Sequence, residues 1–230
     1  MWASGPKSKE MGVSMSSEIK VISLDLDGVL YDGYNAAFAV AKQIGLEEKY
    51  LELFQRMEKE QMDIRTTVIE GAKIWKGVPI DAKYHILVKK LPLMEGAEET
   101  VATLKEWGYD VGCISSGVSQ FFMEPLTRRL NLDFAYSHIL GSENEIHDGT
   151  VQFTMGGPEK VTTIMQYAQI KGYPLDSIAS VGNGLNDINL FKFSALSIAF
   201  NPVEKSVSDA ATVTIESKDL RDILAYFERN

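Results

Sequence analysis

The stretch Val21–Leu30, with the sequence VISLDLDGVL, constrains the fold more than any other part of the chain. Its apolar, partly β-branched run ends in two carboxylates, Asp25 and Asp27, and a glycine then breaks the run. This pattern predicts a buried strand that carries both carboxylates at its C-terminal end. Because successive strand residues face opposite ways, side chains two residues apart point to the same side. The sequence therefore predicts a site at the carboxyl edge of a sheet, where α/β proteins bind ligands.

Two carboxylates so close together also indicate a kind of chemistry. Their desolvation is unfavourable unless a cation or a shared proton compensates it. One carboxylate can attack a phosphorus atom while the pair recruits a divalent metal ion. We therefore treat Asp25 and Asp27 as candidate catalytic and metal-binding residues.

The acidic charge and the single cysteine limit the partners of the chain. A formal net charge of −9 argues against nucleic acids and anionic membranes, which favour basic proteins. Cys113 is the only cysteine, so no intrachain disulfide is possible, which is typical of a reducing compartment. No stretch is apolar and long enough to span a bilayer. We expect a cytoplasmic protein without nucleic-acid or membrane partners, and the sequence does not indicate its oligomeric state.

Strand-like and helix-like stretches alternate over most of the chain, which predicts an α/β fold with a largely parallel sheet. Residues 33–91 depart from this alternation, because their apolar side chains recur at helical spacing and no clear strand is present. We expect three parts: a polar, disordered tail at 1–17, a sheet core at 18–32 and 92–230, and a helical insertion at 33–91. A hairpin turn is expected at His147–Thr150, with His147 exposed.

Four groups of polar residues stand at predicted strand ends or helix starts. Hydroxyls and N–H groups at a helix start suit an oxyanion, and a lysine can place its charge on a phosphoryl oxygen. Each group alone is common as a helix cap, a surface lysine or a turn. Their order along a parallel sheet, which would bring them to one edge, favours a shared site. The groups are Asp25 with Asp27; Ser115, Ser116 and Gly117; Lys160; and Asn183 with Asp187.

With these four groups the chain resembles the haloacid dehalogenase superfamily, Mg-dependent phosphatases that use an aspartate nucleophile. The groups match the four motifs of that superfamily in order, and the resemblance runs from Ile19 to about Phe227. The insertion at 33–91 resembles the small helical cap of the phosphoserine-phosphatase-like branch, as do Glu95–Thr100 and Asp219–Leu224. The resemblance implies a Rossmann-like core with an inserted cap. It also implies a Mg-dependent phosphomonoester hydrolase that acts on a small phosphorylated metabolite through an aspartyl-phosphate.

The resemblance assigns catalytic and phosphate-binding roles residue by residue. Asp25 is similar to the nucleophile that becomes the aspartyl-phosphate. Asp27 is similar to the general acid and base, which protonates the leaving oxygen and then activates water. Ser115, together with the N–H groups of Ser116 and Gly117, would hold the phosphoryl oxygens.

The remaining two motifs concern charge and metal. Lys160 would screen Asp25 from the charge of the substrate and stabilise the transferring group. Asp25, the carbonyl of Asp27, Asn183 and Asp187 would form the Mg²⁺ site. The branch usually has Asp where this chain has Asn183, and a neutral amide binds a hard cation less strongly than a carboxylate. We therefore expect a Mg²⁺ affinity lower by ~10-fold or more.

The residues that would recognise phosphoserine itself are different in this chain. The branch has Glu at the entry to the cap, where this chain has Tyr34, and Arg on a cap helix, where this chain has Ile69–Gly71. Arg65 and Lys73 are the nearby cations that are left to bind a carboxylate. Because a site built to pair polar groups rejects analogues that lack them, we expect a different small metabolite as substrate.

Two other functions are compatible with the same motifs. A phosphotransferase would pass the phosphoryl group to another hydroxyl, and an acceptor-dependence assay would reveal it. A non-enzymatic protein would keep the fold and only bind a phosphorylated ligand. Asn183 favours the binding protein, whereas Asp25, Asp27, Ser115 and Lys160 favour the enzyme.

Overall fold

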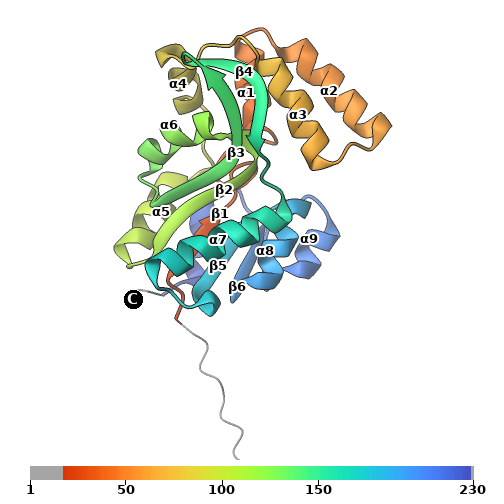
Figure 1. Ribbon diagram of the computed structural model, residues 1–230. Helices are drawn as coiled ribbons and strands as arrows, with labels where there is room; N and C mark the ends of the chain where they lie inside the picture. Colours follow the sequence, from red (N-terminus) through yellow and green to blue (C-terminus); the bar gives the residue numbers. More distant parts are fainter. Residues whose placement is uncertain (1–17, 229–230) are drawn as a thin grey trace, which may run out of the picture.

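The computed structural model describes residues 18–228, so the tail expected at 1–17 lies outside the described residues. A seven-stranded sheet, in the order β4-β3-β2-β1-β5-β6-β7, forms the centre of the molecule (Figure 1). All neighbouring strands pair in parallel except β3 and β4. The α/β fold predicted from the alternating pattern is confirmed. The strands are β1 (Val21–Leu24), β2 (Asp110–Ser119), β3 (Phe134–Glu143), β4 (Ile146–Phe153), β5 (Ile178–Gly182), β6 (Leu196–Phe200) and β7 (Val213–Ile215).

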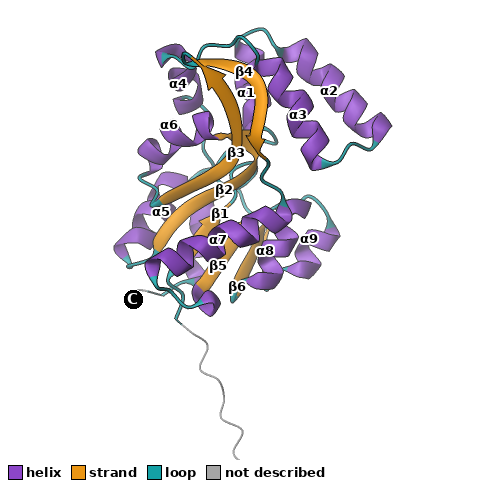
Figure 2. Cartoon of the chain, viewed as in Figure 1, coloured by secondary structure: helices purple, strands orange, loops and turns teal. Residues whose placement is uncertain are grey.

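Helices cover both faces of the sheet, as Figure 2 shows. On one face, Ile164 of α7 and Leu190 of α8 pack against Val21 and Ile178 of the strands. On the other face, α5, α6 and the 3₁₀-helix η3 complete the larger apolar cluster. Burial on both faces explains why the central strands β1, β5 and β6 are mostly apolar and almost wholly buried. These helices are α5 (Ala97–Glu106), α6 (Gln120–Leu130), α7 (Gly157–Lys171), α8 (Ile188–Phe193), α9 (Lys205–Ala210) and η3 (Leu220–Tyr226).

Four helices follow β1 within residues 33–91, where the sequence predicts helices and no strand. They are α1 (Ala36–Gln43), α2 (Glu47–Glu60), α3 (Ile64–Trp75) and α4 (Ala82–Lys89). Asn35, Asp63 and Asp81 cap α1, α3 and α4 through their side chains. Trp75 links these helices to the core, because its ring meets both Tyr84 of α4 and Phe122 of α6 edge to face. Within residues 18–228, none of the helices combines the length and the apolar character needed to cross a membrane.

The hairpin of β3 and β4 corrects two expectations. Its turn lies at Asn144 and Glu145, which both adopt left-handed backbone conformations (φ 50° and 59°), whereas the segment His147–Thr150 lies inside β4. His147 is not exposed: 2% of its surface is accessible, and its ring packs against Trp75 and Phe121. The Asp-Gly pair suggested a turn, but the hairpin instead bends at an asparagine, a residue that tolerates left-handed backbone.

Candidate active site

Parallel register brings the sequence motifs to one edge of the sheet. Leu24, the last residue of β1, is paired with Cys113 of β2 on one side and with Val181 of β5 on the other. Asp25 continues this register, since its N–H donates to the carbonyl of Val181 at 2.9 Å. The residues that follow Leu24, Cys113 and Val181 therefore meet at the carboxyl edge of the three central strands.

Lys160 is the centre of the site. It lies on the first turn of α7 and is fully buried, and its Nζ donates to Asp25 Oδ1 at 2.8 Å and to Asp187 Oδ1 at 2.7 Å. Burial alone would lower the pKa of this lysine, but the two carboxylates outweigh that effect and raise it above its usual value. Lys160 therefore keeps its positive charge inside the protein, directly beside Asp25.

Asp187 holds both the lysine and the loop before it. Its Oδ2 accepts hydrogen bonds from the N–H groups of Asn183 and Gly184, both at 3.0 Å, while Oδ1 accepts from Lys160. A Cβ on Gly182 would lie 2.3 Å from Asp187 Cγ, so this approach requires glycine. Both oxygens of Asp187 are thus already engaged within the protein, and its predicted role as a metal ligand remains a prediction.

The environment of Asp25 is crowded with negative charge. Burial, followed by the charge of Asp187, raises the pKa of Asp25 to about 6, although Lys160 acts in the opposite direction. Asp25, Asp27 and Asp187 together supply three carboxylates against the single ammonium of Lys160. The site is therefore electrostatically suited to a further cation.

Asp27 is held in place by the start of α1. Its Oδ1 accepts a hydrogen bond from the N–H of Ala36 at 2.7 Å, and its Oδ2 faces Gly117, where an added Cβ would lie only 2.0 Å away. Burial and the charge of Asp25 raise the pKa of Asp27 to about 7. A carboxyl with this pKa can give up and take back a proton at neutral pH, as a general acid and base must.

The C-terminal half of β2 presents hydroxyl groups to the same edge, because this strand continues to Ser119 and includes Ser115–Gly117, which the sequence places after a strand end. Ser115 is fully buried, and its Oγ accepts a hydrogen bond from the N–H of Gly117 at 3.0 Å, which leaves the hydroxyl proton of Ser115 free to point elsewhere. The hydroxyl of Ser116 is buried without a partner among the described residues. A phosphoryl oxygen would satisfy such an orphaned donor.

His138 supports this part of β2, a role that the sequence did not indicate. Its Nδ1 accepts the N–H of Met155 at 2.9 Å, so Nε2 carries the proton and donates to the carbonyl of Ser116 at 2.8 Å. Burial lowers the pKa of His138, which keeps the ring neutral. A histidine on a strand, far from the motifs in sequence, gives no local signal of such a contact.

Asn183 packs against the turn that carries Asp27. A Cβ on Gly28 (φ 75°) would lie 2.0 Å from Asn183 Nδ2, so the amide group rests on the backbone of this turn. Within residues 18–228, no cluster of three or more His, Cys, Asp or Glu side chains is positioned to hold a metal ion. The available set is a carboxylate from Asp25, a backbone carbonyl and this amide. These are hard oxygen donors, so they fit Mg²⁺, with one negative charge fewer than a set that includes two acids.

The cap residues suggested for phosphoserine do not gather at this site. The side chain of Tyr34 is 94% exposed. Lys73 pairs with Glu70 at 2.5 Å on the outer side of α3. Arg65 lines a separate hollow beside Phe153 and Glu159. None of these three side chains therefore provides the expected partner for an amino-acid head group.

Comparison with known proteins places the chain in a family. A family model of haloacid dehalogenase-like hydrolases matches residues 19–192. A phosphoserine phosphatase from Methanocaldococcus jannaschii is 29% identical over 221 residues, which cover 93% of this chain and 100% of the relative. Two solved structures, a phospho-aspartyl intermediate analogue of phosphoserine phosphatase and a substrate-bound phosphoserine phosphatase complex, superpose with TM-scores of 0.77 and 0.78. Each is 28% identical and covers 92% of this chain and 100% of its own.

The chain belongs to the haloacid dehalogenase-like hydrolases. Within them it falls in the phosphoserine-phosphatase-like branch, as its motifs predict.

Proposed function

We propose that the chain hydrolyses the phosphomonoester of a small metabolite, with Asp25 as nucleophile and Asp27 as general acid and base. The buried Lys160, held between Asp25 and Asp187, is the observation that supports this proposal most strongly. An ordinary structural ion pair gains little from such complete burial, whereas a phosphoryl-transfer site needs a fixed positive charge beside its nucleophile.

The reaction divides into two steps. In the first, a carboxylate oxygen of Asp25 forms a bond to phosphorus while the bond to the leaving oxygen breaks, and the protonated Asp27 gives its proton to that oxygen. In the second, the carboxylate of Asp27 takes a proton from water as the water oxygen attacks phosphorus. The bond between phosphorus and Asp25 then breaks, which releases inorganic phosphate and restores both side chains.

The surrounding residues position and neutralise the phosphoryl group. Lys160 places its charge beside the transferring group, and the hydroxyls of Ser115 and Ser116 donate to phosphoryl oxygens. Asp25, the carbonyl of Asp27 and Asn183 would hold Mg²⁺, which supplies positive charge that offsets the nucleophile and the phosphate. Asp187 keeps Lys160 and the loop at Asn183 in place.

Residues 33–91 serve as the cap in this proposal, and residues 18–32 and 92–230 as the catalytic core. The cap helices cover the edge where the four motifs meet, and Ala36 of α1 contacts Asp27 directly. Closure of such a cover excludes bulk water from the reaction. The substrate is a phosphorylated metabolite other than phosphoserine, because none of Tyr34, Arg65 and Lys73 lines the cavity beside Ser116 and Gly117.

The direct test is phosphate release from a broad panel of phosphomonoesters, with and without Mg²⁺. We expect Mg-dependent release that disappears in Asp25→Asn, with the folded state of this variant verified by circular dichroism. If the folded wild-type protein at saturating Mg²⁺ released no phosphate from any ester, the enzymatic proposal would fail and a ligand-binding role would replace it. A turnover comparison in which phosphoserine surpassed all other esters would overturn the substrate assignment.

A further inference from the structure

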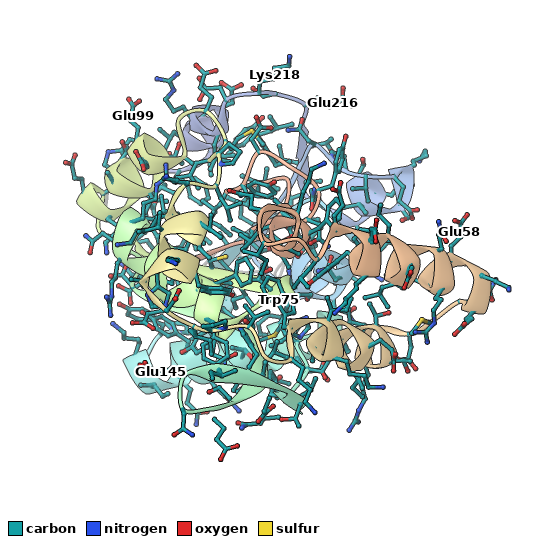
Figure 3. The ribbon with its side chains drawn as sticks, turned by 90° about the horizontal axis from the view of Figure 1, so that it is seen from above. Glu58, Trp75, Glu99, Glu145, Glu216 and Lys218 are labelled. Atoms are coloured by element: carbon teal, nitrogen blue, oxygen red, sulfur yellow. The ribbon has the colours of Figure 1, made fainter. Side chains whose placement is uncertain are left out.

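A cavity lies between the helices of 33–91 and the C-terminal end of β2. It has a volume of ≈190 Å³, and its walls come from α2, α3 and Ser116–Ser119. Aromatic and aliphatic side chains form most of its surface. Examples are Leu53, Phe54, Val68, Trp75 and Phe122. Figure 3, which views the molecule from above, shows Trp75 near the middle of the molecule and Glu58 and Glu145 at its outer edge.

The cavity begins where the leaving group of the ester would be. Gly117 belongs to its wall and also faces Asp27 Oδ2, the oxygen of the general acid that is not bound to Ala36. Ser116, whose hydroxyl has no partner among the described residues, belongs to the same wall. An ester with its phosphoryl group at Ser115 and Ser116 would therefore extend its organic part into this cavity.

The walls offer no charge to a substrate. Among the described residues that line the cavity, none is Asp, Glu, Lys or Arg. The charged side chains of α2 and α3 lie outside this cavity, and Glu70, for example, binds Arg56 at 3.1 Å and Lys73 at 2.5 Å there. The hydroxyl of Tyr50 already accepts a hydrogen bond from Trp75 Nε1 at 2.6 Å.

An ammonium or carboxylate on the leaving group would lose its hydration here without gaining a partner, which is strongly unfavourable. An apolar group gains about 25 cal/mol for each Å² of surface that it buries. An apolar cavity of about 150 Å³ accommodates benzene. This cavity therefore suits an uncharged group of that size or slightly larger.

We propose that the substrate is the phosphomonoester of an uncharged, mainly apolar alcohol with roughly the bulk of a benzyl or short branched alkyl group. The proposal rests on the phosphomonoesterase function above and assigns its substrate class. Specificity then comes from shape and desolvation in the cavity, not from ion pairs with an amino-acid head group.

The first test compares kcat/KM for benzyl phosphate and isopentyl phosphate with the values for O-phosphoserine and phosphoethanolamine, at saturating Mg²⁺. We expect the better of the two uncharged esters to exceed both charged ones by about 100-fold, because the charged groups would be buried unpaired. The faster of benzyl phosphate and isopentyl phosphate indicates whether the preferred alcohol is aromatic or aliphatic. Equal or higher values for O-phosphoserine or phosphoethanolamine would overturn the proposal.

A second test places one carboxylate at two neighbouring positions of α3. Val68 lines the cavity, whereas Ile69 is 39% exposed and faces the separate hollow at β4. Val68→Glu should raise KM for the preferred uncharged ester at least tenfold, and Ile69→Glu, which adds the same charge to the same helix, should leave it unchanged. Equal effects of the two variants would contradict the proposal, provided that thermal unfolding shows both to be folded.

Binding measurements separate this proposal from the function on which it rests. Calorimetric titration of the esters into Asp25→Asn reports on the cavity without turnover. Tighter binding of benzyl or isopentyl phosphate than of O-phosphoserine would support the substrate class even if wild-type protein hydrolysed nothing, in which case only the enzymatic function would fail. Tighter binding of O-phosphoserine would reject the proposed substrate class. Phosphate release from any ester would still support the phosphomonoesterase function in that case.

Discussion

Replacement of Lys160 with methionine keeps most of the side-chain bulk and removes the charge, so it isolates what the ammonium contributes to folding. In the wild-type protein Nζ lies 2.8 Å from Asp25 and 2.7 Å from Asp187, and all three side chains are buried. Lys160→Met leaves both carboxylates without a counter-charge. Removal of one partner from a buried ion pair is destabilising by about 3–5 kcal/mol, which is the loss that we expect at pH 8 without Mg²⁺.

This loss should become smaller in acid. With Lys160 present, the pKa of Asp25 is already raised to about 6, and loss of the ammonium raises it further. A carboxyl whose pKa is higher in the folded than in the unfolded state stabilises the fold at low pH, and this contribution is lost as pH rises through the folded pKa. At pH 5, Asp25 is therefore protonated in the variant and no longer carries a charge that needs compensation. For each unit by which Lys160→Met raises the pKa of Asp25, the loss of unfolding free energy relative to wild type should be about 1.4 kcal/mol smaller at pH 5 than at pH 8.

Urea unfolding at pH 5 and pH 8, in the presence of EDTA, measures this effect. Lys205→Met is a matched control, because Lys205 also pairs with a carboxylate, Asp209 at 2.6 Å, but its side chain is 84% exposed. Exposed pairs contribute little to stability, so the control should resemble wild type at both pH values. If Lys160→Met lost the same free energy of unfolding at pH 5 as at pH 8, the coupling of Lys160 to the protonation of Asp25 would be wrong.

Four further changes test other parts of the site. Asn183→Asp should lower the Mg²⁺ concentration for half-maximal activity by about 10-fold or more, because it restores a charged ligand; an equal Mg²⁺ requirement in a titration of both proteins would refute this. His138→Phe releases the carbonyl of Ser116 and should lower kcat by about 10-fold or more, with weaker inhibition by inorganic phosphate; unchanged inhibition would show that His138 does not position Ser116. Asp27, with its pKa raised to about 7, stabilises the Mg-free fold below pH 4 and loses this contribution as pH rises through 7; urea unfolding of Asp27→Asn should therefore show less loss between pH 5 and pH 8 than wild type does. Burial lowers the pKa of His147 to about 4, so its neutral ring stabilises the fold above about pH 6.5 and this is lost as pH falls through 4; His147→Phe should unfold less readily than wild type at pH 4, and equal acid sensitivity would count against this.

The sheet and the sites at its edge were predictable because they depend on local patterns. Apolar runs that end in polar residues define the strand ends, and parallel pairing then brings Asp25 and Asp187 to one edge without further information. Val21–Leu30 is the clearest example, because these ten residues contain both an apolar strand and the carboxylates at its end. The motif order therefore predicts which residues meet, although not how they bind one another.

Contacts between distant segments were not predictable from such patterns. His138 binds the carbonyl of Ser116 only because β3 packs beside β2, and the burial of His147 depends on Trp75, which belongs to a different part of the chain. The different roles of Asn183 and Asp187 were not predictable either. Asp187 binds the backbone N–H groups of Asn183 and Gly184, and no rule of residue spacing reveals such bonds. The absence of charge from the cavity walls was not predictable either. The helices α2 and α3 are rich in charged residues, and only the packing shows that these side chains point away from the cavity.

The pairing of β4 with the segment between α3 and α4 limits how residues 33–91 can move relative to the sheet. Gly77 donates to the carbonyl of His147, His147 donates to that of Val78, and Ile80 donates to that of Glu145. These backbone bonds fasten the C-terminal end of α3 to the catalytic core, so the insertion cannot swing away as one rigid body while they persist. Among the described helices and strands, α2 has its main contacts with α1 and α3 and none of this backbone pairing. With the hairpin paired, α2 is therefore the helix of residues 33–91 that can shift with the least loss of contacts to the rest of the fold.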